Sequence, residues 1–172
     1  MGAVLTSLSP LPALESGAVL DPETMRHVDR ALADPAATLD LGDAWAGVHY
    51  TLSAEVPMPR PEAERRGIEW NPESTENAIM GGRLTGRDDV MGGSRWLSPD
   101  ETATVARVLA PISEDQFRSW YDVEGLVEAD IGPPVWNSDP RAVDWLTQSF
   151  VRLKDFYARA AAARHGVLIT IE

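Results

Sequence analysis

Apolar positions recur along this chain with two different periods, and the clearest pattern lies near its C-terminus. Between Pro140 and Arg164 they are spaced three and four residues apart, which predicts one long amphipathic helix. Its apolar positions are Val143, Leu146, Phe150, Leu153 and Tyr157. Gly166 then favours a helix end, and the almost wholly apolar run from Val167 to Ile171 is typical of a strand covered on both faces. The pattern therefore predicts a long C-terminal helix followed by a terminal strand.

Shorter helices are predicted from residues that cap helix N-termini. The clearest start is Ser98, because Pro99 is favoured at the first helical position and Glu101 completes a capping box. The predicted starts are Asp21-Pro22, Asp40 or Asp43, Ser98-Pro99 and Ser113. Each start precedes apolar residues at helical spacing, so each of these helices is expected to bury one face.

Strands and loops are indicated by short apolar runs and by proline and glycine. Val4 to Leu8 is a candidate first strand, and Ala78 to Met80 and Ser94 to Leu97 are strand candidates on either side of a glycine-rich stretch, Gly81 to Gly93. Four prolines predict a surface loop at about residues 55–77. We expect a single α+β domain over residues 1–172, with several helices packed around a small mixed or antiparallel sheet.

Composition and charge narrow the possible partners. The chain has 172 residues with 27 acidic and 15 basic side chains, which give a formal net charge of -12. A chain of this length buries about 70% of its surface and needs no metal or disulfide to hold a core. The negative excess disfavours binding to nucleic acid and to anionic membranes, and favours a basic protein partner, although net charge also serves solubility alone. The oligomeric state stays open.

The predicted compartment is the cytoplasm. The chain contains no Cys, whereas a small secreted domain often uses disulfides. The first residues, Met1 to Leu14, hold no Lys or Arg, and Pro10 and Pro12 interrupt their apolar stretch, so a secretory signal is not expected. The apolar runs are shorter than the 18 or so residues of a membrane-spanning helix, and no membrane association is predicted.

His49 is the first candidate for chemistry, because an imidazole beside Trp45 and Tyr50 could act as a base, an acid or a ligand near neutral pH. The alternative is a structural histidine, since no adjacent residue completes a nucleophile and base pair. The three His residues show no metal-binding spacing. We therefore predict no catalytic residue, no metal and no cofactor.

The glycine-rich stretch is the second candidate. Its paired glycines match neither the P-loop nor the dinucleotide-binding pattern, and turn geometry explains them equally well. Arginine and aspartate side chains could form a polar rim around it for anions or proteins. With His49 and one tryptophan, the candidate binding residues are His49, Arg83, Arg87, Asp88, Asp89, Arg95 and Trp136.

Three stretches together resemble a known family. They are LDLGDAWAGVH at residues 39–49, AIMGG at 78–82 with MGGSRWLSP at 91–99, and FVRLKDFY at 150–157. In this order they resemble the YfbM-like family of small bacterial proteins of unassigned function, over most of the chain from about Asp21. The resemblance implies a single α+β domain and carries over no catalytic residue.

Two functions remain as hypotheses. The first is a cytosolic protein-interaction module, for instance an immunity-type inhibitor that binds and neutralises a basic toxin or effector. Small size, acidity and the set of Trp96, Trp120 and Trp136 favour it, because aromatic residues with a charged rim are common in recognition surfaces. The alternative is an enzyme or small-ligand-binding domain with a pocket at the Gly81–Gly93 loop near His49.

Overall fold

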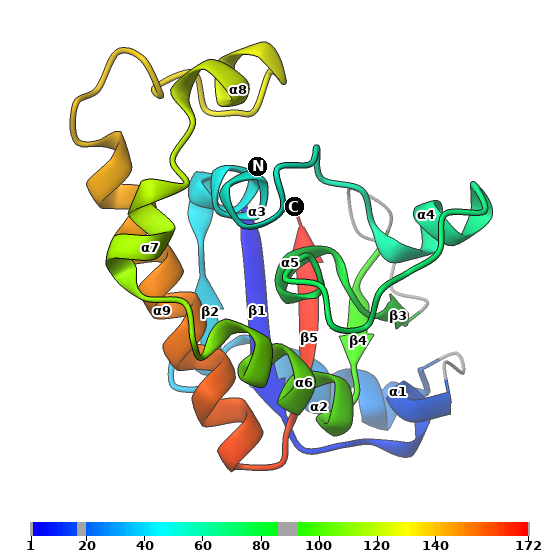
Figure 1. Ribbon diagram of the computed structural model, residues 1–172. Helices are drawn as coiled ribbons and strands as arrows, with labels where there is room; N and C mark the ends of the chain where they lie inside the picture. The colour runs from blue at the N-terminus through cyan, green and yellow to red at the C-terminus, as the bar shows by residue number, and fades with distance from the viewer. Residues whose placement is uncertain (1, 17–19, 86–92, 172) are drawn as a thin grey trace.

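Five strands form one antiparallel sheet in the part of the chain that the computed structural model describes, residues 2–16, 20–85 and 93–171 (Figure 1). The strands are β1 (Ala3–Leu8), β2 (Thr38–Asp40), β3 (Arg83–Leu84), β4 (Arg95–Leu97) and β5 (Gly166–Ile171), in the order β2-β1-β5-β4-β3. The predicted terminal strand is confirmed as β5, which is buried throughout. It lies between β1 and β4 and is antiparallel to both.

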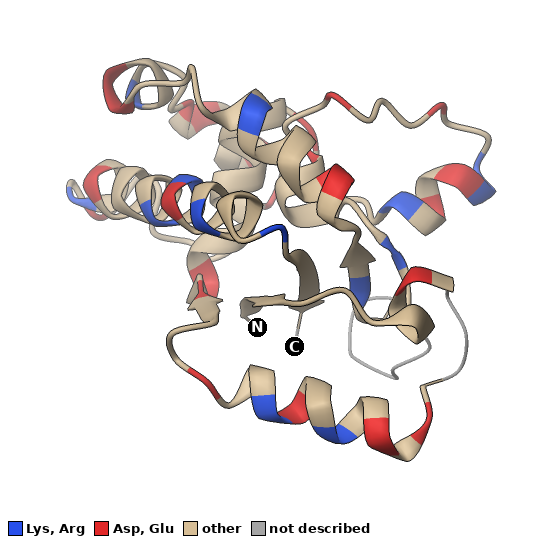
Figure 2. Ribbon diagram, turned by 90° about the horizontal axis from the view of Figure 1, so that it is seen from below, with Lys and Arg blue, Asp and Glu red and all other residues tan. Residues whose placement is uncertain are grey.

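The sheet separates two hydrophobic cores, because successive strand residues point to opposite faces. Leu5 and Ile169 belong to the larger core, and Leu168 and Trp96 belong to the smaller one. The larger face is covered by α3 (Trp45–Ser53), α5 (Asn77–Met80), α6 (Pro99–Leu109) and α9 (Ala142–Ala162), the smaller by α1 (Pro12–Ser16) and α2 (Pro22–Leu32). Figure 2 shows α2 on one side of the sheet and the larger group of helices on the other. This arrangement confirms the α+β class.

The longest predicted helix is confirmed as α9, which has 21 residues and is about 30 Å long. Leu146, Phe150 and Leu153 are completely buried, as their spacing predicts. Three short helices surround this body: α4 (Arg60–Arg65), α7 (Glu114–Ser119) and α8 (Val123–Glu128). Helix α7 packs on α9 through Phe117, whose ring stacks on Phe150 with centroids 4.2 Å apart.

Three of the predicted helix starts are confirmed by their hydrogen bonds. The Ser98 hydroxyl accepts from the amide of Glu101, and a carboxylate oxygen of Glu101 accepts from the Ser98 amide at 2.8 Å, so the capping box is complete. The side chains of Asp21 and Ser113 also cap α2 and α7, by accepting from backbone amides of the first turn. These caps form because local sequence supplies both donor and acceptor.

Two local predictions are wrong. Ala78 to Met80 belongs to helix α5 and not to a strand. Neither Asp40 nor Asp43 caps α3: Asp40 ends the edge strand β2, and a 3-10 turn at Gly42–Ala44 leads into the helix, which has no side-chain cap. The segment at residues 55–77 also contains α4, because a proline at the start of a helix favours its first turn.

Candidate functional site

Arg95 of β4 is completely buried beneath α5. Its Nε donates to the carbonyl of Gly81 at 3.2 Å and its Nη2 to the carbonyl of Ile79 at 2.9 Å. Its Nη1 has no hydrogen-bond partner in the described residues. Carbonyls at the C-terminal end of a helix favour a cation. These two hydrogen bonds therefore offset part of the cost of burying the guanidinium charge, and they hold α5 on the sheet. Burial nevertheless lowers the pKa of Arg95 to about 10.

His49 lies in α3 close to Arg95 and is only 2% exposed. Burial, and secondly the positive charge of Arg95, lower the pKa of His49 to about 4. Tyr157 of α9 lies near the same guanidinium; its hydroxyl donates to the carbonyl of Ala78 at 2.8 Å, and burial raises its pKa. His49 is therefore neutral and enclosed at neutral pH, which agrees with the structural alternative for this residue.

Arg83, another predicted binding residue, does not join Arg95 beside His49. Arg83 lies opposite Trp96 in the β3–β4 ladder, so it shares the face of Trp96, while Arg95 points to the opposite face. Arg83 is exposed at the edge of the sheet. The structure thus separates Arg83 from Arg95, two of the three arginines of the predicted rim. Arg87, Asp88 and Asp89 lie outside the described residues.

The three tryptophans of the interaction hypothesis do not form a surface cluster. Trp96 and Trp136 are buried in the two different cores, and Trp120 is 39% exposed. The Trp136 ring fills the space beside Gly47, where a Cβ would lie 2.5 Å away, and its Nε1 donates to the carbonyl of Ile131. Trp136 therefore packs the fold and is not available to a partner.

An open groove of about 560 Å³ lies where the start of α3 meets the segment before α9. We call it the acidic groove, because Asp40, Asp43 and Asp139 line it together with Trp145 and Arg152. Trp145 is 36% exposed, and its ring stacks on the buried Trp136 ring at 5.9 Å and 18°. The Arg152 guanidinium donates to the backbone carbonyl of Asp40 at 3.0 Å. An indole face beside carboxylates suits a cationic side chain.

The chain that borders this groove is strongly acidic. Residues 119–140, here named the acidic segment, contain no Lys or Arg. Their acidic residues are Asp122, Glu124, Glu128, Asp130 and Asp139. Trp120 and Val127 are exposed in the same segment, at 39% and 48%. By contrast, α2 carries acidic and basic residues along its length (Figure 2). Charge is therefore distributed unevenly over the molecule.

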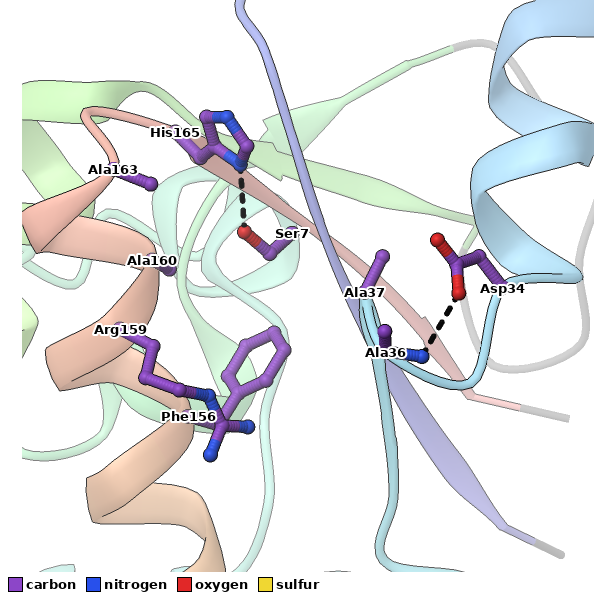
Figure 3. A pocket seen from close by; sticks show the side chains of 9 residues that line it. All are labelled: Ser7, Asp34, Ala36, Ala37, Phe156, Arg159, Ala160, Ala163 and His165. Carbon is purple, nitrogen blue, oxygen red and sulfur yellow. Dashed lines mark hydrogen bonds between the residues drawn. The ribbon is translucent and has the colours of Figure 1, made fainter.

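A second cavity was not indicated by any sequence pattern. It has a volume of about 300 Å³ and lies between β1 and the end of α9, where Ser7, Arg159 and His165 line it (Figure 3). Ser7 and His165 are 158 positions apart, and only the pairing of β1 with β5 brings them together. No local spacing could have predicted this contact.

The described residues contain no group of three or more His, Asp or Glu side chains that could hold a metal ion. None of the helices in the described ranges is both long and apolar enough to cross a membrane.

Comparison with known proteins identifies relatives of unknown function. A family model described as a domain of unknown function, DUF1877, matches residues 14–170. The crystal structure of YfbM, a protein of unknown function from Escherichia coli, superposes with a TM-score of 0.67 over 100% of both chains, at 15% sequence identity. At this identity the likeness shows the fold alone. No curated protein matches the chain.

Proposed function

The chain belongs to the DUF1877 family, and we propose that it is a protein-interaction module whose acidic groove and acidic segment bind a basic surface of another protein. The observation that carries this proposal is the groove itself. It presents an exposed indole, Trp145, beside the carboxylates of Asp40, Asp43 and Asp139. An arginine or lysine side chain of a partner would stack on the indole and donate to the carboxylates.

The acidic segment extends this surface. Its five acidic residues and the exposed side chains of Trp120 and Val127 combine charge with apolar area. Such a surface attracts a basic protein over a distance of about 10 Å at ordinary salt, and apolar contacts then slow its release. A formal net charge of -12 adds to this attraction.

The finer form of the proposal is an immunity-type inhibitor that neutralises a basic toxin or effector in the cytoplasm. Small size and an acidic surface support it. The alternative, a ligand pocket at the Gly81–Gly93 loop near His49, has less support, because His49 is enclosed and neutral.

A peptide-binding experiment tests recognition of a basic surface. The probe is a fluorescent arginine-rich peptide, compared with the same peptide carrying glutamate at every arginine. We expect saturable binding of the arginine peptide alone, weakened by salt. Trp145→Ala and the double variant Glu124→Lys/Glu128→Lys should each raise Kd by at least about tenfold.

The matched control is Glu55→Lys/Glu69→Lys, which changes the net charge equally at exposed positions outside the acidic segment. It should change Kd by less than about twofold. Equal effects of the two double variants would show that binding depends on net charge and not on this surface.

For the inhibitor form, a host toxin should be neutralised by the wild-type protein and not by Trp145→Ala. Neutralisation that survives this substitution refutes the assignment of the groove.

A further inference from the structure

The second cavity, of about 300 Å³, has an apolar wall and a polar end. Phe156 and Ala160 extend from α9, and Ala163 follows its last residue. Ala36 and Ala37 line the cavity from the turn before β2 (Figure 3). This turn is fixed on β1, because the Ser7 amide donates to the Ala37 carbonyl at 2.8 Å. The apolar wall therefore belongs to rigid elements, as is usual for small-molecule sites.

The polar end is built around His165, which follows α9. Its Nδ1 lies 3.1 Å from the Ser7 hydroxyl and its Nε2 lies 3.4 Å from the Ser9 hydroxyl. Each ring nitrogen thus faces a serine. In the tautomer that carries its proton on Nδ1, the Ser7 hydroxyl accepts from the ring and keeps its own proton for another acceptor. In Figure 3, Ser7 points from β1 toward His165 across the end of the cavity. In that tautomer, Ser7 presents a hydroxyl donor to a molecule inside the cavity.

The charge at this cavity differs from that of most of the surface. Arg159 lines it and is exposed, and no carboxylate in the described residues pairs with its guanidinium. Asp34 lies on the opposite rim, and one of its carboxylate oxygens accepts from the Ala36 amide at 2.9 Å. A guanidinium and a hydroxyl on one side suit an anion there, away from Asp34.

We propose that this cavity binds a small organic carboxylate. Its carboxylate group contacts the Arg159 guanidinium and accepts a hydrogen bond from the Ser7 hydroxyl, while its hydrocarbon part lies against Phe156 and the alanines. A guanidinium matches a carboxylate with two parallel hydrogen bonds. The apolar wall selects an organic anion over a hydrated inorganic one.

The same residues do not make a nucleophilic site. In a serine and histidine pair that performs catalysis, a third group, usually a carboxylate, orients the imidazole through its second nitrogen. Here the second nitrogen of His165 faces Ser9. The geometry therefore supports binding and not covalent chemistry.

Titration by heteronuclear NMR tests this site directly with butyrate as the probe. We expect saturable shifts at the amides of Ala36, Ala37, Ala160 and Ala163. Neutral butyramide, which has the same hydrocarbon part, should leave these amides unchanged, and inorganic phosphate should bind more weakly than butyrate. Equal shifts with butyramide, or tighter binding of phosphate, would overturn the assignment to an organic carboxylate.

Substitutions separate the contact between Arg159 and butyrate from the effect of net charge. Arg159→Gln should weaken butyrate binding by at least about tenfold. Arg26→Gln, an exposed position on α2 with the same change in charge, should leave Kd within about twofold of the wild-type value. Ser7→Ala should weaken binding by a smaller factor than Arg159→Gln. The proposal is refuted if Arg159→Gln keeps a folded spectrum and binds butyrate as tightly as the wild-type protein. It is also refuted if Arg26→Gln loses as much butyrate affinity as Arg159→Gln. Neither result bears on the acidic groove.

Discussion

Mild acidification should destabilise this protein through His49, which is held neutral in the folded state. The pKa of this imidazole falls from the ordinary 6.5 to about 4 on folding, because burial and secondly Arg95 disfavour its charged form. Since the unfolded chain binds a proton more readily between these values, the stability supplied by His49 is complete above pH 6.5. It decreases as the pH falls toward about 4.

The magnitude follows from this difference in pKa. About 2.5 pKa units correspond to about 3 kcal/mol at full protonation, since each unit is worth about 1.4 kcal/mol. At about pH 4.5 most of it, roughly 2 to 3 kcal/mol, should already be lost. This loss is a large fraction of the stability of an average domain, which is about 5–15 kcal/mol.

Urea unfolding at about pH 7.5 and about pH 4.5 measures this effect when the wild-type protein is compared with His49→Gln. Glutamine keeps a polar side chain of similar size but does not titrate. Acidic residues titrate in the same pH range, and their contribution to stability is shared by both proteins. Subtracting the loss of the variant from the loss of the wild-type protein therefore removes this contribution. The wild-type protein should lose about 2 kcal/mol more than the variant on acidification. Parallel losses within about 0.5 kcal/mol would refute the burial argument for His49.

Three further substitutions test contacts that hold the fold, each by its urea midpoint. Gly166→Ala should destabilise by about 2 kcal/mol or more, because its Cβ would lie 2.2 Å from the Trp96 ring and 2.6 Å from a backbone oxygen. Gly2→Ala, with its nearest atom at 3.6 Å, is the control that should behave as wild type. Ser98→Ala should lose about 1 kcal/mol with the cap of α6; an unchanged midpoint contradicts that role. Tyr157→Phe should lose about 1–2 kcal/mol, since the buried carbonyl of Ala78 loses its donor, and a loss below about 0.3 kcal/mol would mean that this carbonyl finds another partner.

The sequence predicts those elements whose signals are local. Ser98 and Glu101 bond to each other across one turn, so the start of α6 can be located without knowledge of the rest of the chain. The regular spacing of apolar residues in α9 likewise records one continuous buried face. β5 was predicted for the same reason, because every one of its residues is buried.

Elements that depend on distant contacts were missed. The run from Ala78 to Met80 is too short for its period to separate helix from strand. Its helical form is held by Arg95 and Tyr157, which donate to the carbonyls of Ile79 and Ala78 from other elements. The three-residue strand β2 depends in the same way on pairing with β1.

The candidate sites show the same limit more strongly. Composition indicates an acidic protein, but only the fold shows that Trp145 is exposed beside carboxylates while Trp136 is buried beneath it. Alternation along β4 places Arg95 on the face opposite Trp96, and the sequence does not reveal which of the two faces α5 and the larger group of helices cover. The contact between Ser7 and His165 similarly requires the register of β1 and β5.

The position of β5 in the middle of the sheet also constrains how this protein is made. Ala3 lies opposite Ile171 and Leu8 lies opposite Gly166, so the ribosome completes one partner long before the other. Translation of the roughly 160 residues between them takes roughly 10 to 30 s at ordinary elongation rates. During that interval β1 has a bare edge toward the missing strand, and contacts so distant along the chain close slowly. Nascent chains that have not yet released β5 from the exit tunnel are therefore expected to lack the finished sheet and to need protection from aggregation.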